Sequence, residues 1–187
     1  MVCQTWAETN TVINSSDKMQ PSSRQPSLTR WAWLALTIVL LDQLSKVIAE
    51  ATMRYGQRIN VLPIFDFTLL YNPGAAFSFL ANQPGWQRWF FTIIALLAIA
   101  FITYLMRKHR NDKRFLLALS LILGGAIGNL IDRVLYGHVI DFLLFYWKTW
   151  HYPAFNLADS AITIGAVLLI ADELLRWRKT SDNGAKT

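Results

Sequence analysis

The sequence has a single cysteine, Cys3, and few charged residues, and both scarcities exclude classes of protein. One thiol cannot build a disulfide framework, and no apolar signal segment precedes Cys3, so lipid attachment at this residue is not indicated. Charged residues make up 16% of the 187 residues, against 53% hydrophobic residues. A soluble domain of this length needs a polar shell, so the composition is typical of a polytopic membrane protein.

Two common hydrolytic motifs are also missing. The sequence has no His-Glu-x-x-His, and its histidines His109, His138 and His151 fall on different segments, which argues against a metal site. It has no Gly-x-Ser-x-Gly, and Ser78 lacks an obvious base, so a serine hydrolase is disfavoured. We therefore expect neither a metal nor another cofactor.

What the sequence does contain is four long apolar segments. Each approaches the length that an α-helix needs to cross a hydrocarbon core of about 30 Å. The first is too long for a cleaved signal peptide and reads as an uncleaved anchor. The predicted fold class is therefore mainly α, with four transmembrane helices at about residues 31–49, 89–106, 115–135 and 155–175.

The segments between and beyond these spans are more polar. Residues 1–29 are poor in apolar side chains and predict a disordered tail, residues 30–178 a membrane domain, and residues 179–187 a second polar tail. Between the first two spans, branched and aromatic residues alternate with proline and glycine, which predicts short strands broken by turns. Residues 136–152 are predicted to be a loop whose aromatic side chains suit the headgroup belt.

Lysine and arginine are distributed unevenly around the predicted spans. The basic residues before the first span, in the run from 107 to 114 and in the run from 176 to 179 all fall on one side of a four-span topology. By the positive-inside rule this side is cytoplasmic, so both termini are predicted inside. This asymmetry explains the formal net charge of +6, which therefore gives no support to nucleic acid binding.

Several polar residues interrupt the apolar segments at helical spacing. Asp42 and Lys46 lie four apart and can pair on one helix face, and Asn129, Asp132 and Arg133 cluster near the end of the third span. Both groups could be structural pairs that stabilise the bundle. Residues 124–128 form a small-residue face that lets two helices approach closely.

Asp141 and Asp159 border the last span, where a carboxylate is costly. Charges at bilayer depth cost several kcal/mol and are usually retained for ion movement, proton relay or chemistry. Asn156, Asp159 and Thr163 form a polar stripe, and the intervening loop can bring Asp141 to the same membrane boundary. Spacing alone leaves open whether the two aspartates share a site or whether Asp159 simply bonds a neighbouring helix.

A shared site would have a specific chemical use. Two adjacent carboxylates do not both ionise easily, so one can act as base and the other as acid on a peptide bond, as in aspartic proteases. Two alternatives come from other classes: a proton- or ion-coupled transporter, and a non-catalytic membrane scaffold. The polar residues gather towards the outer face and no inverted repeat is evident, which argues against the transporter.

Five sequence blocks together resemble one family, the bacterial lipoprotein signal peptidases (signal peptidase II). They are Asp-Gln-Leu-Ser-Lys, Tyr-Asn-Pro-Gly-Ala-Ala-Phe-Ser, Gly-Gly-Ala-Ile-Gly-Asn-Leu-Ile-Asp-Arg, Val-Ile-Asp-Phe and Phe-Asn-Leu-Ala-Asp-Ser, at residues 42–46, 71–78, 124–133, 139–142 and 155–160. Their order and spacing cover roughly residues 31–178. Any one block would be weak, but the set is specific.

The resemblance implies an aspartic endopeptidase that removes the signal peptide from prolipoproteins, cutting just before a cysteine that carries diacylglycerol. It implies that Asp141 and Asp159 are the catalytic dyad. Nine further positions match residues that bind substrate or order the dyad: Asp42, Lys46, Asn72, Gly74, Asn129, Asp132, Arg133, Asn156 and Ala158.

The resemblance also implies where the enzyme works. The mixed segment after the first span would form a small β-cradle outside the cytoplasm, and the site would lie near the periplasmic face of the inner membrane. The implied partners are a lipid-modified prolipoprotein and membrane lipids, with no nucleic acid. The oligomeric state stays open, with a monomer as one option.

Overall fold

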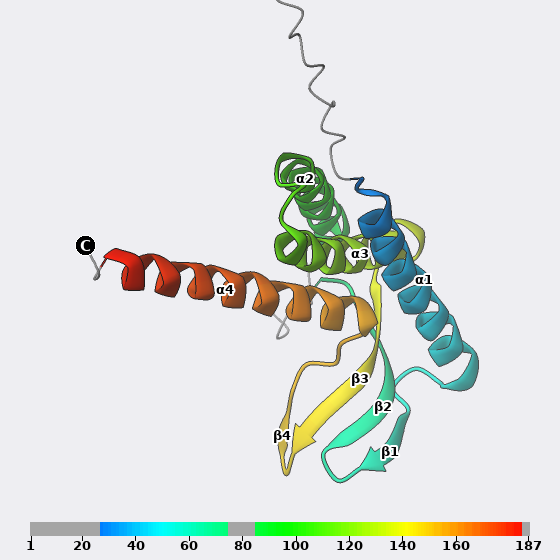
Figure 1. Ribbon diagram of the computed structural model, residues 1–187. Helices are drawn as coiled ribbons and strands as arrows, with labels where there is room; N and C mark the ends of the chain where they lie inside the picture. Colours follow the sequence, from blue (N-terminus) through cyan, green and yellow to red (C-terminus); the bar gives the residue numbers. More distant parts are fainter. Residues whose placement is uncertain (1–26, 75–84, 185–187) are drawn as a thin grey trace, which may run out of the picture.

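The chain is described by a computed structural model at residues 27–74 and 85–184, with side chains to residue 178. These residues form four long helices and a small antiparallel sheet (Figure 1). Cys3 and Ser78 lie outside the described residues. The elements in chain order are α1 (Thr29–Thr52), β1 (Arg58–Leu62), β2 (Phe65–Asn72), α2 (Trp86–Lys108), α3 (Lys113–Leu135), β3 (Val139–Trp147), β4 (Trp150–His151) and α4 (Leu157–Gly184).

The helical class is confirmed, and a helix occupies each predicted span. By length and composition, α1, α2 and α3 could each cross a membrane, whereas α4 is not among the helices that meet this standard in the described part of the chain. It carries four acidic residues, Asp159, Asp172, Glu173 and Asp182. α4 also continues to Gly184, through residues predicted as a polar tail, because neither glycine nor proline interrupts residues 166–183.

α3 is the central helix and packs against α1, α2 and α4. The predicted small-residue face makes this packing possible, because Gly124 and Gly128 face α1 while Gly125 faces α4. A Cβ at Gly128 would lie 2.5 Å from Asp42 Oδ2, and one at Gly125 would collide with the backbone oxygen of Ala158. The prediction of close helix approach is therefore confirmed.

The four strands form one antiparallel sheet in the order β1-β2-β3-β4. β1 and β2 confirm the strands predicted between the first two spans. The loop prediction for residues 136–152 was wrong, because this segment supplies β3 and β4. Val139, Ile140, Asp141 and Phe142 are all buried, so both faces of β3 are covered and the sequence lacks the polar alternation that marks a half-exposed strand.

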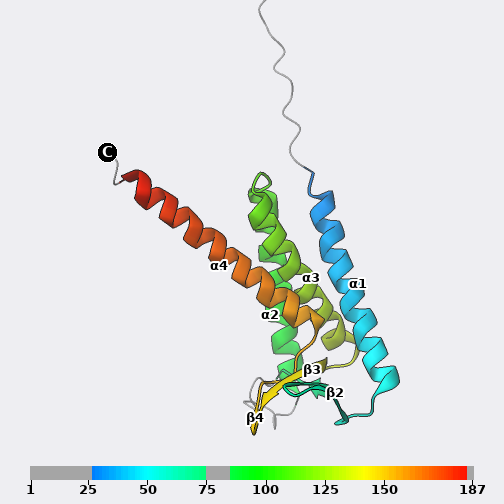
Figure 2. The ribbon, with the colours of Figure 1, turned by 60° about the horizontal axis from the view of Figure 1, so that its bottom comes forward.

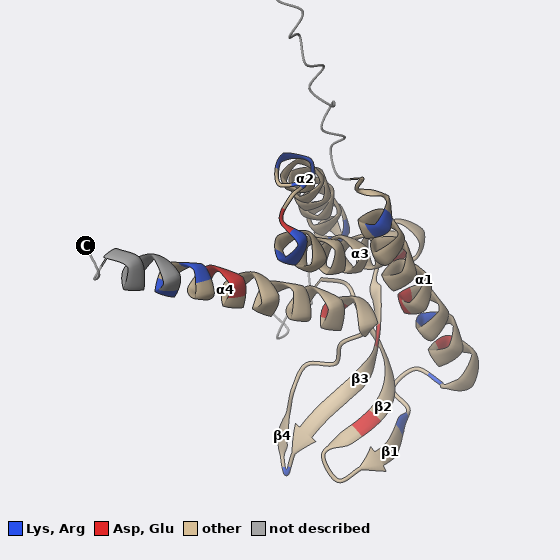
Figure 3. Cartoon of the chain, viewed as in Figure 1, with Lys and Arg blue, Asp and Glu red and all other residues tan. Residues whose placement is uncertain are grey.

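The sheet lies at one end of the bundle, and the basic runs lie at the other (Figures 2 and 3). Arg176 on α4 forms ion pairs with Asp112, in the turn between α2 and α3, and with Asp172 at 2.7 Å. These contacts tie the far part of α4 to the α2–α3 turn. The polar residues predicted for the site lie at the opposite end, where β3 and the start of α4 meet α1 and α3.

Candidate active site

Asp141 and Asp159 come together because β3 and the first turn of α4 meet beside α3. Asp141 is the third residue of β3 and is buried, while Asp159 is the third residue of α4 and is partly buried. Two asparagines link their carboxylates. Asn156 contacts Asp141 and also Asn129, and Asn129 contacts Asp159.

Asp141 accepts a hydrogen bond at each oxygen. Asn156 Nδ2 donates to Oδ1 at 2.8 Å, and Asn72 Nδ2, at the end of β2, donates to Oδ2 at 3.1 Å. The Asn72 amide is oriented because its Oδ1 accepts from the backbone N–H of Gly74 at 2.9 Å. Gly74 has φ +107, and a Cβ there would collide with the ring of Phe91, so only glycine fits this turn. Asn72 and Gly74 thus fix one side of Asp141.

Asp159 is held differently. Its Oδ1 accepts from Asn129 Nδ2 at 2.7 Å, and its backbone N–H donates to Asn156 Oδ1 at 2.9 Å. The second bond is an N-cap of α4 by Asn156, which lies just before the helix and not within it. Asp159 Oδ2 has no hydrogen-bond partner in the part of the chain that the structure describes. Asp159 also lines a pocket beside α4, so a water molecule or a substrate can reach this residue.

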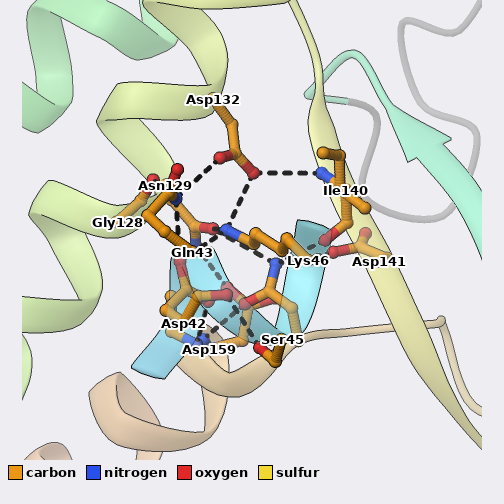
Figure 4. A network of polar contacts seen from close by, with 12 residues as sticks. Asp42, Gln43, Ser45, Lys46, Gly128, Asn129, Asp132, Ile140, Asp141 and Asp159 are labelled. Atoms are coloured by element: carbon orange, nitrogen blue, oxygen red, sulfur yellow. Dashed lines mark hydrogen bonds and ion pairs between the residues drawn. The ribbon is translucent and has the colours of Figure 1, made fainter. Parts of the chain in front are cut away.

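Lys46 lies at the centre of a buried polar network beneath this pair (Figure 4). Its side chain is 1% exposed, and its ammonium group contacts three oxygens. These are Asp42 Oδ2 at 2.8 Å, Asp132 Oδ2 at 2.7 Å and Asn129 Oδ1 at 3.0 Å. Three donors thus meet three acceptors, which is how a buried ammonium can be tolerated.

The network orients Asn129 towards Asp159. An ammonium group can only donate, so Lys46 holds the Oδ1 atom of Asn129 towards itself. The Nδ2 group of Asn129 then faces Asp159. Lys46 therefore acts on Asp159 indirectly, because it determines that the Nδ2 end of the Asn129 amide faces the Asp159 carboxylate.

Asp42 connects α1 to the start of α4. Its Oδ1 accepts from the backbone N–H of Ala158 at 2.9 Å, and both residues are completely buried. The carboxylate sits against Gly128, where any side chain would displace it. Asp42 and Gly128 thereby fix the position of Ala158, the residue that precedes Asp159 in the sequence.

Asp132 performs the same task for β3. Its Oδ2 accepts from the backbone N–H of Ile140 at 3.2 Å, next to Asp141 in the sequence. Gln43 Nε2 donates to Asp132 Oδ1 at 2.9 Å and also contacts the carbonyl of Gly128 at 3.2 Å. Gln43 was not predicted as a site residue, although an amide beside Asp42 in an apolar helix was a usable signal.

Arg133 lies at the edge of the site. Its Nη1 donates to the backbone oxygen of Asn129 at 3.3 Å, and its guanidinium lies over the ring of Phe91, 5.6 Å from the centroid. The scaffold pairing considered for the adjacent Asp132 and Arg133 is not seen, because the Asp132 carboxylate pairs with Lys46 instead. Arg133 Nε is buried without a partner among the described residues.

The environment of Asp141 favours its neutral form. Burial raises the pKa of Asp141 to about 7, and the nearby Asp159 carboxylate adds to the rise, while the hydrogen bonds from Asn72 and Asn156 oppose it. A carboxyl group with such a pKa can give up or take a proton near neutral pH. Among the described residues, no group of three His, Cys, Asp or Glu side chains could hold a metal ion.

Comparisons with known proteins agree on one family. The family model of signal peptidase (SPase) II matches residues 34–175. The chain is 55% identical over 157 residues to the lipoprotein signal peptidase of Paraburkholderia phytofirmans, covering 84% of this chain and 91% of that protein. It is 57% identical over 149 residues to the lipoprotein signal peptidase of Cupriavidus pinatubonensis, covering 80% and 85%.

The fold is similar to a solved structure as well. A bacterial membrane enzyme determined at 2.3 Å resolution superposes with a TM-score of 0.72 at 34% sequence identity. The match covers 84% of this chain and 93% of that chain. The residues that the family model matches, 34–175, include the whole polar network described above.

Proposed function

This chain belongs to the signal peptidase II family, and on that premise we propose that it is a membrane aspartic endopeptidase. It removes the signal peptide from diacylglyceryl-modified prolipoproteins, cutting on the N-terminal side of the lipidated cysteine. The assignment as an aspartic peptidase is supported by one observation: the carboxylates of Asp141 and Asp159 are joined through Asn156 and Asn129. The remaining matched residues hold this pair in place.

The two aspartates have different roles in the proposed reaction. Asp159, which lines the pocket beside α4, takes a proton from a water molecule as that water attacks the scissile carbonyl carbon. Asp141, whose pKa is raised to about 7, is the protonated partner and donates its proton to the carbonyl oxygen. The tetrahedral intermediate then collapses: one of its hydroxyl groups returns a proton to Asp141 as the C=O bond re-forms, the C–N bond breaks, and the leaving nitrogen takes the proton that Asp159 had received.

The proposed topology has four spans with both termini in the cytoplasm of a bacterial inner membrane. α4 is the fourth span, since no charged residue lies between Asp159 and Asp172 and both of these carboxylates have partners. Asp159 bonds Asn129 and Asp172 pairs with Arg176. The sheet and the aspartates then lie near the periplasmic face, where a lipid-anchored substrate presents its cysteine. Proton- or ion-coupled transport has no support in the comparisons.

Cleavage of a defined substrate tests this function. The protein in detergent should cleave a diacylglyceryl-modified prolipoprotein, and Asp141→Asn and Asp159→Asn should each reduce the rate by at least about a thousandfold, since each removes a group that transfers a proton. Asp66→Asn is a matched control, because Asp66 is a buried carboxylate that pairs with Arg58 away from the dyad. Wild-type rates in either dyad variant would refute the aspartic assignment.

A further inference from the structure

Tyr152 stands between the two aspartates. One pocket, here called the sheet pocket, has a volume of about 560 Å³ and is lined by Asp141, whereas a second pocket of about 310 Å³ beside α4 is lined by Asp159. Tyr152 lines both pockets, and its ring lies edge-on to that of Phe155 with the centroids 6.0 Å apart. The proposed reaction brings both carboxylates to one peptide bond, and on that proposed function Tyr152 has to move.

Tyr152 belongs to a short and weakly held segment. It directly follows β4, which has two residues and pairs with the end of β3 at Tyr146 and Trp147. The N–H of Tyr152 donates to the backbone oxygen of Phe145 at 2.9 Å. Lys148, in the turn between the strands, has φ 56, a left-handed conformation that is unfavourable for a residue with a side chain. Few contacts and local strain are typical of segments that open before the rest of a fold.

One side-chain contact links this segment to the opposite edge of the sheet. β1 and β4 are the two edge strands, and Arg58 Nη1 on β1 lies 3.2 Å from His151 Nε2 on β4 (Figure 1). Both residues line the sheet pocket, so their contact, here called the latch, joins its two sides. The rest of the guanidinium is engaged elsewhere, since Nε and Nη2 donate to Asp66 Oδ2 at 2.9 and 2.6 Å.

The latch requires a neutral imidazole. A guanidinium can only donate, so His151 Nε2 is the acceptor. The other ring nitrogen, Nδ1, lies 3.1 Å from the backbone oxygen of Thr149 and therefore carries the hydrogen. A second proton would put an N–H on Nε2, facing the N–H of Arg58, and would place one cation beside another. Histidine is the side chain whose charge ordinarily changes between pH 5 and 8, so acidification breaks this contact.

The other groups that face His151 give its proton no second partner. On β3, its ring stacks on Tyr146 with the centroids 5.9 Å apart, and the Arg58 guanidinium lies over the same ring at 5.3 Å. On β2, the Asp66 carboxylate is already paired with Arg58 at 2.6 Å. Lys148 in the adjoining turn is a further cation. These groups together carry no net negative charge that would hold a protonated His151 in place.

We propose that β4 is a lid over the proposed catalytic pair, latched by Arg58 and His151 and released when His151 is protonated. Release lets β4 swing away from β1 and carries Tyr152 out from between the two pockets, so that both aspartates face one continuous space. Phe155 anchors the moving segment, because its backbone N–H and oxygen bond to Leu143 on β3 at 3.0 and 2.9 Å. At neutral pH the lid opens transiently, and acidification increases the open fraction.

Spin labels on the two sides of the latch test the proposal. Gln57→Cys and Thr149→Cys, in a Cys3→Ser background, introduce one label beside each edge strand at an exposed position. In detergent at pH 8 the labels should show one short distance, and at pH 5.5 the ratio of closed to open molecules should fall at least about fivefold. His151→Gln is the matched variant, because glutamine accepts from Arg58 through Oε1 but does not ionise, so it should stay closed at both pH values.

A further variant separates the latch from the dyad. The pKa of Asp141 in the same pocket is about 7, so this group also titrates in the range tested. In Asp141→Asn the labels should still separate at pH 5.5. Unchanged distances in the otherwise wild-type protein, a change that persists in His151→Gln, or a change that is lost in Asp141→Asn would each overturn the latch.

Cleavage of a diacylglyceryl-modified prolipoprotein tests the lid. At pH 8, His151→Lys should raise kcat/KM at least about threefold because its permanent charge opens the lid, and Tyr152→Ala should do so because the ring is gone. The double variant should be no faster than either single one. Additive gains, or no gain in either variant, would overturn the lid. If wild type cleaves no lipidated substrate, the proposed function fails, whereas the latch stands or falls on the label distances alone.

Discussion

Replacing Asp141 with asparagine should abolish activity and yet stabilise the protein above neutral pH. The pKa of Asp141 is about 7 in the folded protein, mainly because of burial, against the usual 3.8. Between these values the folded state binds one more proton than the unfolded state, so stability is highest at the acid end and is lost as pH rises to 7. The loss over about three pH units amounts to about 4 kcal/mol.

Asparagine avoids this loss but gives up one hydrogen bond. Both oxygens of Asp141 accept from amide donors, Asn156 at 2.8 Å and Asn72 at 3.1 Å, and asparagine offers only one oxygen. The mismatch costs about 1–2 kcal/mol. At pH 8 the net gain should be about 2–3 kcal/mol. At pH 5 wild type has lost only about 1–2 kcal/mol, because the unfolded state already ionises above pH 3.8, and this equals the cost of the mismatch, so the two proteins should be nearly equal.

The assay is equilibrium unfolding in detergent at pH 5 and pH 8, followed by tryptophan fluorescence. Wild type should lose stability between the two pH values, and Asp141→Asn should lose much less. Asp66→Asn should instead be less stable at both pH values, because it leaves Arg58 without its carboxylate partner at 2.6 Å. If the stability of Asp141→Asn fell with pH as steeply as that of wild type, the assigned environment of Asp141 would be wrong.

Three further predictions concern the residues around the dyad. Asn72→Ala removes a hydrogen bond that lowers the pKa of Asp141, so the alkaline limb of the pH–rate profile should move to higher pH. If the limb does not move, Asp141 is not the proton donor. Lys46→Met leaves two carboxylates buried without their cation and should cost about 3–5 kcal/mol in denaturant titrations, and a cost below 1 kcal/mol would contradict the network. Gly128→Ala puts a methyl group 2.5 Å from Asp42 Oδ2 and should cost about 1–3 kcal/mol, whereas a neutral effect on melting would mean that α1 and α3 are not so close.

The sequence was informative where one pattern has one structural meaning. Long apolar segments predicted the four helices, and the glycines at 124–128 predicted close helix contact. The strand β3 was missed because Val139, Ile140 and Phe142 are buried on both faces, and an unbroken apolar run lacks a strand period. Its aromatic continuation then resembled a membrane-surface loop.

The site was predictable as a set of residues but not as a set of bonds. Spacing left the partner of Asp132 open, with the adjacent Arg133 as the simplest choice. The structure pairs Asp132 with Lys46, which lies 86 positions earlier in the chain. Pairing at this separation depends on how α1 packs against α3, and helical periodicity describes one helix at a time. Gln43 was missed for a similar reason, since two of its partners, the carbonyl of Gly128 and the carboxylate of Asp132, lie on α3.

The pairing of Lys46 with carboxylates on two helices has a consequence for how the protein enters the membrane during synthesis. α1 emerges first and carries its own counter-charge, since Asp42 lies one turn from Lys46 and they pair at 2.8 Å. It can therefore insert as an overall neutral pair. Asp132 emerges later, near the end of α3, where a lone aspartate costs less than the about 2.5–3.5 kcal/mol of a helix centre but is still unfavourable. This cost is relieved when Asp132 reaches Lys46 at 2.7 Å, so the late helix is driven towards the early one. Asp141 and Asp159 come later still in the sequence, so Asp42, Lys46 and Asp132 are already in the chain when the proposed catalytic pair is synthesised.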